Sequence, residues 1–164
     1  MDLKKILVQE FAHETATTVR IFEALSDAIF DYEPHEKSKS TSQLANHIAS
    51  IASWVPAILG TNELDWEKYT PGPTFNNTKD LVAAYKEYTA KGIEALEKLT
   101  DEVLTEEWTM RKGDFVFFTL PKYSVLRNLI LNHTIHHRAQ LGTYLRSNDL
   151  RLPASYVASA DENL

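Results

Sequence analysis

The feature that most restricts the fold of this chain is a long helical period between Ser124 and Leu145. Apolar residues recur there at three- and four-residue spacing, which predicts an amphipathic helix with one buried stripe. The stripe consists of Leu126, Leu129, Ile130, Leu141 and Tyr144. Two histidines, His133 and His137, interrupt it. Residues four apart on a helix have Cβ atoms roughly 5–6 Å apart, so both imidazoles could reach one metal ion.

Three further stretches carry the same period and predict helices over residues 2–30, from a cap at Thr41 or Ser42 to about residue 59, and over 79–99. The irregular segment 60–77 is long enough to run along a bundle, which lets the second and third helices point the same way. We therefore expect a single all-α domain spanning residues 1–164, a four-helix bundle with up-down-down-up topology and a long crossover between helices 2 and 3.

Two segments lie outside the helical pattern. Residues 106–122 contain β-branched and aromatic side chains around a Lys-Gly-Asp turn, which is typical of a short hairpin or an ordered loop. The tail after Asp149 contains Pro153 and few packing signals, so we expect it to wrap over the bundle or to fray.

Composition excludes several classes of function. The chain has 164 residues, no cysteine and a formal net charge of −6. The lack of cysteine excludes disulfides, thiolate nucleophiles and cysteine-bound metal sites, so any metal must be held by histidine, carboxylate or water. The acidic balance argues against a nucleic-acid partner. The sequence contains no secretory signal and no run of about 18 apolar residues, so we expect a cytoplasmic protein without a membrane partner that acts on a small molecule.

A third histidine, His47, lies one helical turn from both Leu44 and Ile51, on or beside the apolar face of the second helix. Taken alone, it is best interpreted as a hydrogen-bonded core residue. The pair on the last helix is different, because two buried imidazoles cost a few kcal/mol unless something binds them. Three imidazoles would leave open positions on a metal, the pattern of catalytic sites. A zinc-protease mechanism lacks its base, since Thr134 follows the first histidine of the pair.

The segments QLANHIASIASW and NHTIHHRAQLGTYLR resemble the DinB/YfiT-like superfamily of metal-dependent four-helix-bundle proteins over nearly the whole chain. The resemblance implies that His47, His133 and His137 are metal ligands and that His136 is a neighbour. It implies a divalent ion, nickel or zinc first, and a homodimer. Some members are thiol S-transferases or isomerases that use an external low-molecular-weight thiol. A metal-dependent hydrolase or a thiol S-transferase is therefore expected.

Other residues and other functions stay open from the sequence. Gln140 and Asn132 flank the turn that carries the histidine pair, and Arg138 is expected in a surface or interface ion pair. Glu14 falls on the apolar stripe of the first helix, where we expect it at the solvated edge. Two alternatives to an enzyme are a non-catalytic bundle that binds a metal or small molecule, and a dimeric interaction module in which the histidines are incidental.

Overall fold

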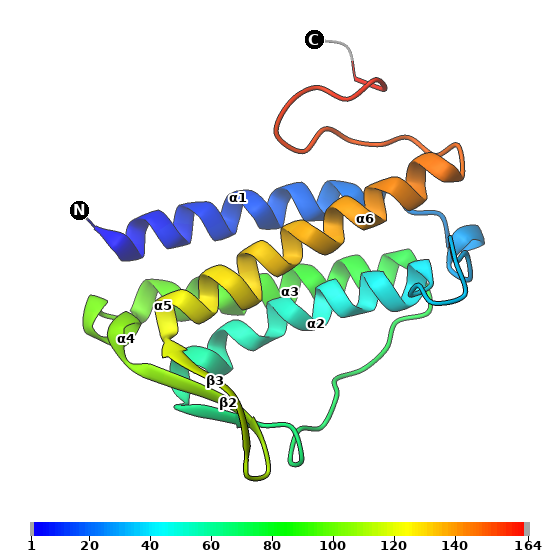
Figure 1. Cartoon of the computed structure of the whole chain (residues 1–164). Helices are drawn as coiled ribbons and strands as arrows, with labels where there is room; N and C mark the ends of the chain where they lie inside the picture. Colours follow the sequence, from blue (N-terminus) through cyan, green and yellow to red (C-terminus); the bar gives the residue numbers. More distant parts are fainter. Residues whose placement is uncertain (1, 163–164) are drawn as a thin grey trace.

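The computed structural model describes residues 2–162 and contains four long helical rods with a small sheet at one end of the bundle (Figure 1). Three rods are α1 (Leu3–Glu23), α2 (Thr41–Gly60) and α3 (Thr78–Lys98), and the fourth ends in α6 (His133–Ser147). Figure 1 shows α1 and α6 running in one direction and α2 and α3 in the other. The long crossover after α2 makes this arrangement possible, because it returns the chain to the end of the bundle where α2 began.

Side-chain caps set the beginnings of α2 and α3. Ser40 accepts a hydrogen bond from the Gln43 backbone N–H, and the Gln43 side chain accepts one from the Ser40 N–H, which is a complete capping box. Asn77 caps α3 by accepting from the Asp80 N–H. Ser40 lies one residue before Thr41 and two before Ser42, the two expected caps, and α3 begins one residue before its expected start at residue 79.

The first helix is shorter than the predicted 2–30. It ends at Glu23, and Ser26 then caps the short 3₁₀ helix η1 (Asp27–Ile29) by accepting a hydrogen bond from Ala28. Ser competes well for backbone donors, so it favours such a break over helix continuation. Leu25 and Phe30, which lie on either side of η1, are both buried. The apolar spacing of the sequence therefore extends past the end of α1, although the helix does not.

The expectation of an all-α fold is wrong in one respect, because the bundle carries a three-stranded sheet. Its order is β1 (Glu63–Asp65), β2 (Glu107–Lys112), β3 (Phe115–Pro121). The first two strands pair in parallel, and β2 and β3 form an antiparallel hairpin whose turn includes Gly113 at φ +56°. The short helix α4 (Asp101–Thr105) leads into β2. The hairpin is one of the two alternatives expected for residues 106–122, whereas the short β1 lies inside the segment expected to be irregular.

The fourth rod is not a uniform α-helix. It starts as α5 (Lys122–Val125), passes through the π-helical segment η2 (Leu126–Asn132) and continues as α6. A π-helical turn changes which carbonyl each N–H reaches, and such turns are frequent at functional sites. Here the π-helical segment ends directly before His133.

The core has two apolar clusters at the two ends of the bundle. The cluster at the sheet end includes Phe11, Val55 and Trp108, and the other includes Phe22, Ile48 and Leu141. Between the two clusters the helices contribute buried polar side chains instead. These side chains include Glu14, Thr17, Thr18, Thr89, Thr134 and Arg138. The middle of the bundle is therefore polar. Thr134 and Arg138 directly follow His133 and His137 on α6, so these two histidines lie in the same polar part of the bundle.

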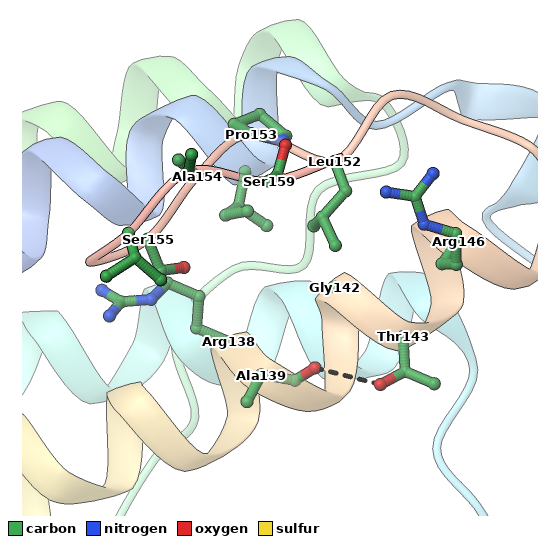
Figure 2. Close-up of a pocket in the computed structure, with 13 residues that line it drawn as sticks. Arg138, Ala139, Gly142, Thr143, Arg146, Leu152, Pro153, Ala154, Ser155 and Ser159 are labelled. Carbon is green, nitrogen blue, oxygen red and sulfur yellow. Dashed lines mark hydrogen bonds between the residues drawn. The ribbon is translucent and has the colours of Figure 1, made fainter. Parts of the chain in front are cut away.

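The tail, residues 149–162, contains no helix or strand and passes over α6 (Figure 1). Two ion-paired side chains hold it: Arg146 of α6 binds Asp161 at 2.7 Å, and the Asp161 carboxylate also accepts the Leu152 N–H. A cavity of about 440 Å³ lies between the tail and α6. Figure 2 shows this cavity, with Arg138 towards one end of its lining and Arg146 towards the other. The tail thus packs against the bundle.

Within residues 2–162, no helix is both long enough and apolar enough to cross a membrane.

Candidate metal centre

Three histidine rings from two helices converge at one point of the bundle. His47 comes from α2, and His133 and His137 come from successive turns of α6. The Nε2 atom of His133 lies 3.3 Å from Nε2 of His47 and 2.8 Å from Nε2 of His137. One ligand atom from each ring lies within 4.8 Å of the others. The lengthwise register of α2 and α6 therefore brings the three side chains together. A shared ion requires this alignment of the two helices.

A backbone carbonyl of the π-helical segment contacts the ring of His133. The backbone N–H of His133 bonds to the carbonyl of Ile130. In an ideal α-helix that N–H would reach the carbonyl of Leu129, four residues earlier. The Leu129 carbonyl lies 3.3 Å from Nδ1 of His133. A carbonyl can only accept, so Nδ1 carries the proton and Nε2 presents its lone pair to the other rings.

Gln140 plays the same part for His137. Its Oε1 atom lies 2.7 Å from Nδ1 of His137, one turn further along α6. The amide oxygen accepts the Nδ1 proton, which leaves Nε2 of His137 free as a ligand. Hydrogen bonds of this kind fix the tautomer and ring orientation of metal-ligating histidines. The sequence places Gln140 beside the turn that carries the histidine pair, and the structure shows it in direct contact with His137.

The surroundings keep the three rings neutral. Burial, followed by the charges of His137, His133 and Lys39, lowers the pKa of His47 from 6.5 to about 4. Burial is also the main cause that lowers the pKa of His133 and of His137, although the contacts with Leu129 and Gln140 act in the opposite direction. The rings are therefore unprotonated at neutral pH, which is the form that binds a metal ion.

The geometry fits a divalent ion. Two imidazole nitrogens at 2.0–2.1 Å from one metal are separated by about 2.9 Å at a right angle and about 3.4 Å at a tetrahedral angle. Two of the three separations, 2.8 Å between His133 and His137 and 3.3 Å between His133 and His47, match these values, and one ligand atom from each ring lies within 4.8 Å of the others. In the tautomers set by their Nδ1 contacts, His133 and His137 also face each other lone pair to lone pair, which is repulsive unless a cation lies between them.

Among the described residues, these three histidines are the group able to share an ion, and no carboxylate joins them. Imidazole nitrogen is a ligand common to zinc, nickel, copper and iron. Three protein ligands leave one or more coordination positions for water or substrate, whereas a structural zinc site has four protein ligands. The arrangement therefore has the composition of an open site.

The other candidates from the last helix lie outside this cluster. His136 is exposed, with its ring centroid 4.9 Å from that of His137, and it is a neighbour of the site. Asn132 is also exposed, and its amide donates to Asn128 at 3.4 Å. It makes no hydrogen bond with the ring that follows it.

Two expectations about charged residues are wrong. Arg138 is not in a surface or interface pair, since its side chain is 2% exposed and its Nη1 lies 2.7 Å from Oε2 of Glu14. Glu14 is not at a solvated edge, since its side chain is 8% exposed. The Tyr156 hydroxyl, from the tail, accepts from Arg138 at 2.9 Å and lies 3.1 Å from both Glu14 carboxylate oxygens. The buried pair joins α1, α6 and the tail beside the histidine site.

Some contacts of the site could not be found from the sequence. The Leu129 carbonyl that contacts His133 lies in a π-helical segment, and no residue type announces such a segment. The charge of Lys39, in the loop before α2, contributes to the lowered pKa of His47 and of His137. Lys39 precedes His133 by 94 residues and belongs to no motif, so the sequence does not connect it with the histidines. The Tyr144 hydroxyl donates to the Lys39 carbonyl at 3.0 Å, and the sequence did place Tyr144 on the same stripe as His137, seven residues later.

Fold and site together define a helical-bundle protein with an open three-histidine cluster between its second and last long helices. The DinB family model matches residues 1–160, and the chain belongs to the DinB family. The uncharacterized protein YjoA of Bacillus subtilis (strain 168) is 28% identical over 141 residues, which cover 85% of this chain and 87% of YjoA.

Two solved structures share the fold. A DinB-like protein from Bacillus cereus ATCC 10987 is 24% identical with a TM-score of 0.74, and the match covers 92% of this chain and 95% of that one. The DinB-like protein YjoA from Bacillus subtilis is 25% identical with a TM-score of 0.71, covering 91% and 96%. The arrangement of helices and sheet is therefore that of DinB-like proteins.

Proposed function

We propose that this protein is a divalent-metal-dependent enzyme in which His47, His133 and His137 hold one ion, nickel or zinc. The observation that carries the proposal is the convergence of three imidazoles: Nε2 of His133 lies 2.8 Å from that of His137 and 3.3 Å from that of His47, and two of the rings are fixed through Nδ1. Membership of the DinB family supports it. A merely structural site would use a fourth protein ligand.

A bound divalent ion supplies a Lewis acid that lowers the pKa of a coordinated water or thiol. The residues of the chain have separate parts in this account. The three imidazoles hold the ion, and the Leu129 carbonyl and Gln140 hold two of the imidazoles in the binding tautomer. The apolar clusters on either side keep the ligand-bearing turns of α2 and α6 in register.

The reaction that we propose is transfer of an external low-molecular-weight thiol to an electrophile. The thiolate sulfur forms the new bond, the leaving group departs with its electron pair, and the thiol proton passes to solvent. Because the chain has no cysteine, the sulfur must come from a cosubstrate. A panel of thiols with one chromogenic electrophile tests this step, and hydrolysis of ester substrates by the same metal-loaded protein would favour the hydrolase instead.

Metal content tests the site itself. Protein purified without a histidine tag and loaded with nickel or zinc is expected to retain one ion per chain, and His133→Ala is expected to lose it. His136→Ala is the matched control, because His136 adjoins the same turn but lies outside the cluster. Retention of the ion by the His133→Ala variant would refute the proposed site.

A second candidate function is a dimeric interaction module. The observation that favours it is the exposed apolar group Phe115, Val116 and Phe117 on the edge strand β3, which are 65%, 51% and 51% exposed. A second copy of this chain could cover this patch by antiparallel pairing of two β3 edges around a twofold axis. Light scattering of the wild type and of Phe117→Ser tests it: a dimer that becomes a monomer supports the module, and a monomeric wild type contradicts it.

A further inference from the structure

The C-terminal tail is held over α6 at two polar points. The Asp161 carboxylate pairs with the Arg146 guanidinium through both oxygens, at 3.2 and 2.7 Å. The Tyr156 hydroxyl accepts from Arg138 at 2.9 Å, and the guanidinium carbon of Arg138 lies 5.5 Å from the centre of the Tyr156 ring. A cavity of about 440 Å³ remains between the tail and α6 (Figure 2). The polar contacts therefore hold the tail in place without closing the space beneath it.

The cavity has the size and the lining of a small-molecule site. Ligand pockets in proteins measure about 300–1,000 Å³. Most side chains of the lining are apolar, and they include Ile21 of α1 and Leu152 of the tail. Val157 lines the cavity as well, although it is 81% exposed. An apolar side chain left in water at the rim of a cavity is stabilised when an apolar ligand covers it.

The cavity lies on a different face of α6 from the metal centre. Gly142, which lines the cavity, follows His137 by five residues, a rotation of about 140° around the helix axis. The three clustered histidines are not among the residues that line the cavity. A molecule in the cavity therefore leaves the coordination positions of the ion free.

Arg146 provides the positive charge of the cavity. Its side chain belongs to the lining and is 47% exposed. Its two Nη atoms bind Asp161, whereas its Nε atom has no hydrogen-bond partner among the described residues. Arg138 is less available, because its side chain is 2% exposed and both of its Nη atoms already have partners. The lining, as far as the described residues form it, contains no aspartate or glutamate, so an anionic group can bind at Arg146.

We propose that the cavity beneath the tail is a second small-molecule site, for a compound with an apolar body and one anionic group. The apolar body lies against Ile21, Leu152 and Val157, and the anionic group binds the Arg146 guanidinium. Asp161 competes for the same guanidinium, so the tail both covers the site and limits the affinity for the ligand. This site adds to the proposed function and does not depend on a metal ion.

Two fluorescent dyes form a matched pair of probes. Anilinonaphthalenesulfonate and phenylnaphthylamine share one aromatic body, and only the former has an anionic group. The emission of both dyes rises in apolar surroundings, so titration of the full-length protein gives a dissociation constant for each. We expect the wild type to bind both dyes, each at one site per chain.

Two variants separate the charge of Arg146 from the attachment of the tail. Arg146→Gln and Asp161→Asn both remove the ion pair that holds the tail, but only the first removes the positive charge. We expect Arg146→Gln to weaken binding of the anionic dye about two- to fivefold, the value of an ion pair open to solvent, and Asp161→Asn to strengthen it by a similar factor. The neutral dye should respond equally to both variants, because both release the tail.

A second pair of variants tests the location of the site. Thr143→Phe places a ring at the rim of the cavity, and Ser147→Phe, one turn further along α6, is its matched control outside the lining. We expect Thr143→Phe to lose both dyes. Ser147→Phe and His133→Ala should bind both dyes as the wild type does.

Four results would overturn the inference. The first is a wild type that binds neither dye. The second is equal affinity of Arg146→Gln and Asp161→Asn for the anionic dye, since Arg146 would then bind no anionic group. The third is equal dye binding by Thr143→Phe and Ser147→Phe, which would place the dyes outside the cavity. The fourth is loss of dye binding in His133→Ala, which would place the dyes at the metal centre.

Discussion

The buried ion pair between Glu14 and Arg138 provides the sharpest test of the packing. Its side chains are 8% and 2% exposed, and the pair is closed at 2.7 Å. Replacing Glu14 by alanine leaves the guanidinium buried without its counter-charge, although the Glu14 carbonyl and Thr18 remain as acceptors. Removing one partner of a buried pair costs about 3–5 kcal/mol. For a chain of this size, each kcal/mol lowers Tm by about 2–4 °C.

We therefore expect Glu14→Ala to lower Tm by about 6–20 °C, measured by circular dichroism at neutral pH on metal-free protein. Glu23→Ala is the control on the same helix. Glu23 pairs with Lys86 at 2.8 Å, but both side chains are about half exposed, at 51% and 53%. An exposed pair contributes about 0–1 kcal/mol, so the control should lower Tm by no more than about 4 °C.

A second variant separates charge burial from a general loss of packing. Replacing both partners, as Glu14→Leu with Arg138→Met, removes the charge that would be left unpaired, and such exchanges are often neutral or stabilising. We expect the double variant to be more stable than Glu14→Ala. A loss below about 1 kcal/mol in Glu14→Ala, or equal losses at Glu14 and Glu23, would refute the assignment of a buried, mutually dependent pair.

The remaining predictions concern the tail, the ring-orienting amide and pH. Tyr156→Phe removes a hydroxyl that binds the buried pair and should lower the free energy of unfolding by about 1–2 kcal/mol in urea titrations; no change would mean that the tail does not engage the pair in solution. Gln140→Leu removes the acceptor for His137 Nδ1 and should weaken metal binding about 10–100-fold by competition with a chelating dye, while Gln140→Glu should retain it. In metal-free protein the pKa of His47 is lowered from 6.5 to about 4. The unfolded chain therefore binds more protons between these values, and the free energy of unfolding should fall as pH decreases from about 6.5 to about 4. His47→Phe should reduce this slope, and an unchanged slope would contradict the assigned cause.

The helical part of the fold could be predicted because helical periodicity is a local property of the chain. Three helices begin and end within a few residues of the predicted bounds, and the exception is α1, which Ser26 helps to end. The strand β1 could not be predicted, because Glu63–Asp65 is short and polar and forms only by pairing with β2, more than 40 residues later. Its existence depends on tertiary structure that the local pattern does not contain.

The site shows the same division. The spacing of His133 and His137 indicates a shared face, but the position of His47 depends on how far α2 slides along α6, which no local pattern gives. Glu14 was placed correctly on the buried stripe, yet its environment was misread because its partner Arg138 lies 124 residues away. A buried carboxylate on an apolar stripe requires a compensating partner in the fold, which here is Arg138.

The coordination of the ion in metal-loaded protein tests the central claim most directly. X-ray absorption spectra of nickel- or zinc-loaded wild type should show three imidazole nitrogens at about 2.0–2.1 Å, completed by oxygen or sulfur from solvent or added ligand. His47→Ala should show two imidazoles, and His136→Ala should match the wild type. An imidazole count that is unchanged by His47→Ala, or a first shell without imidazole, would contradict the three-histidine site.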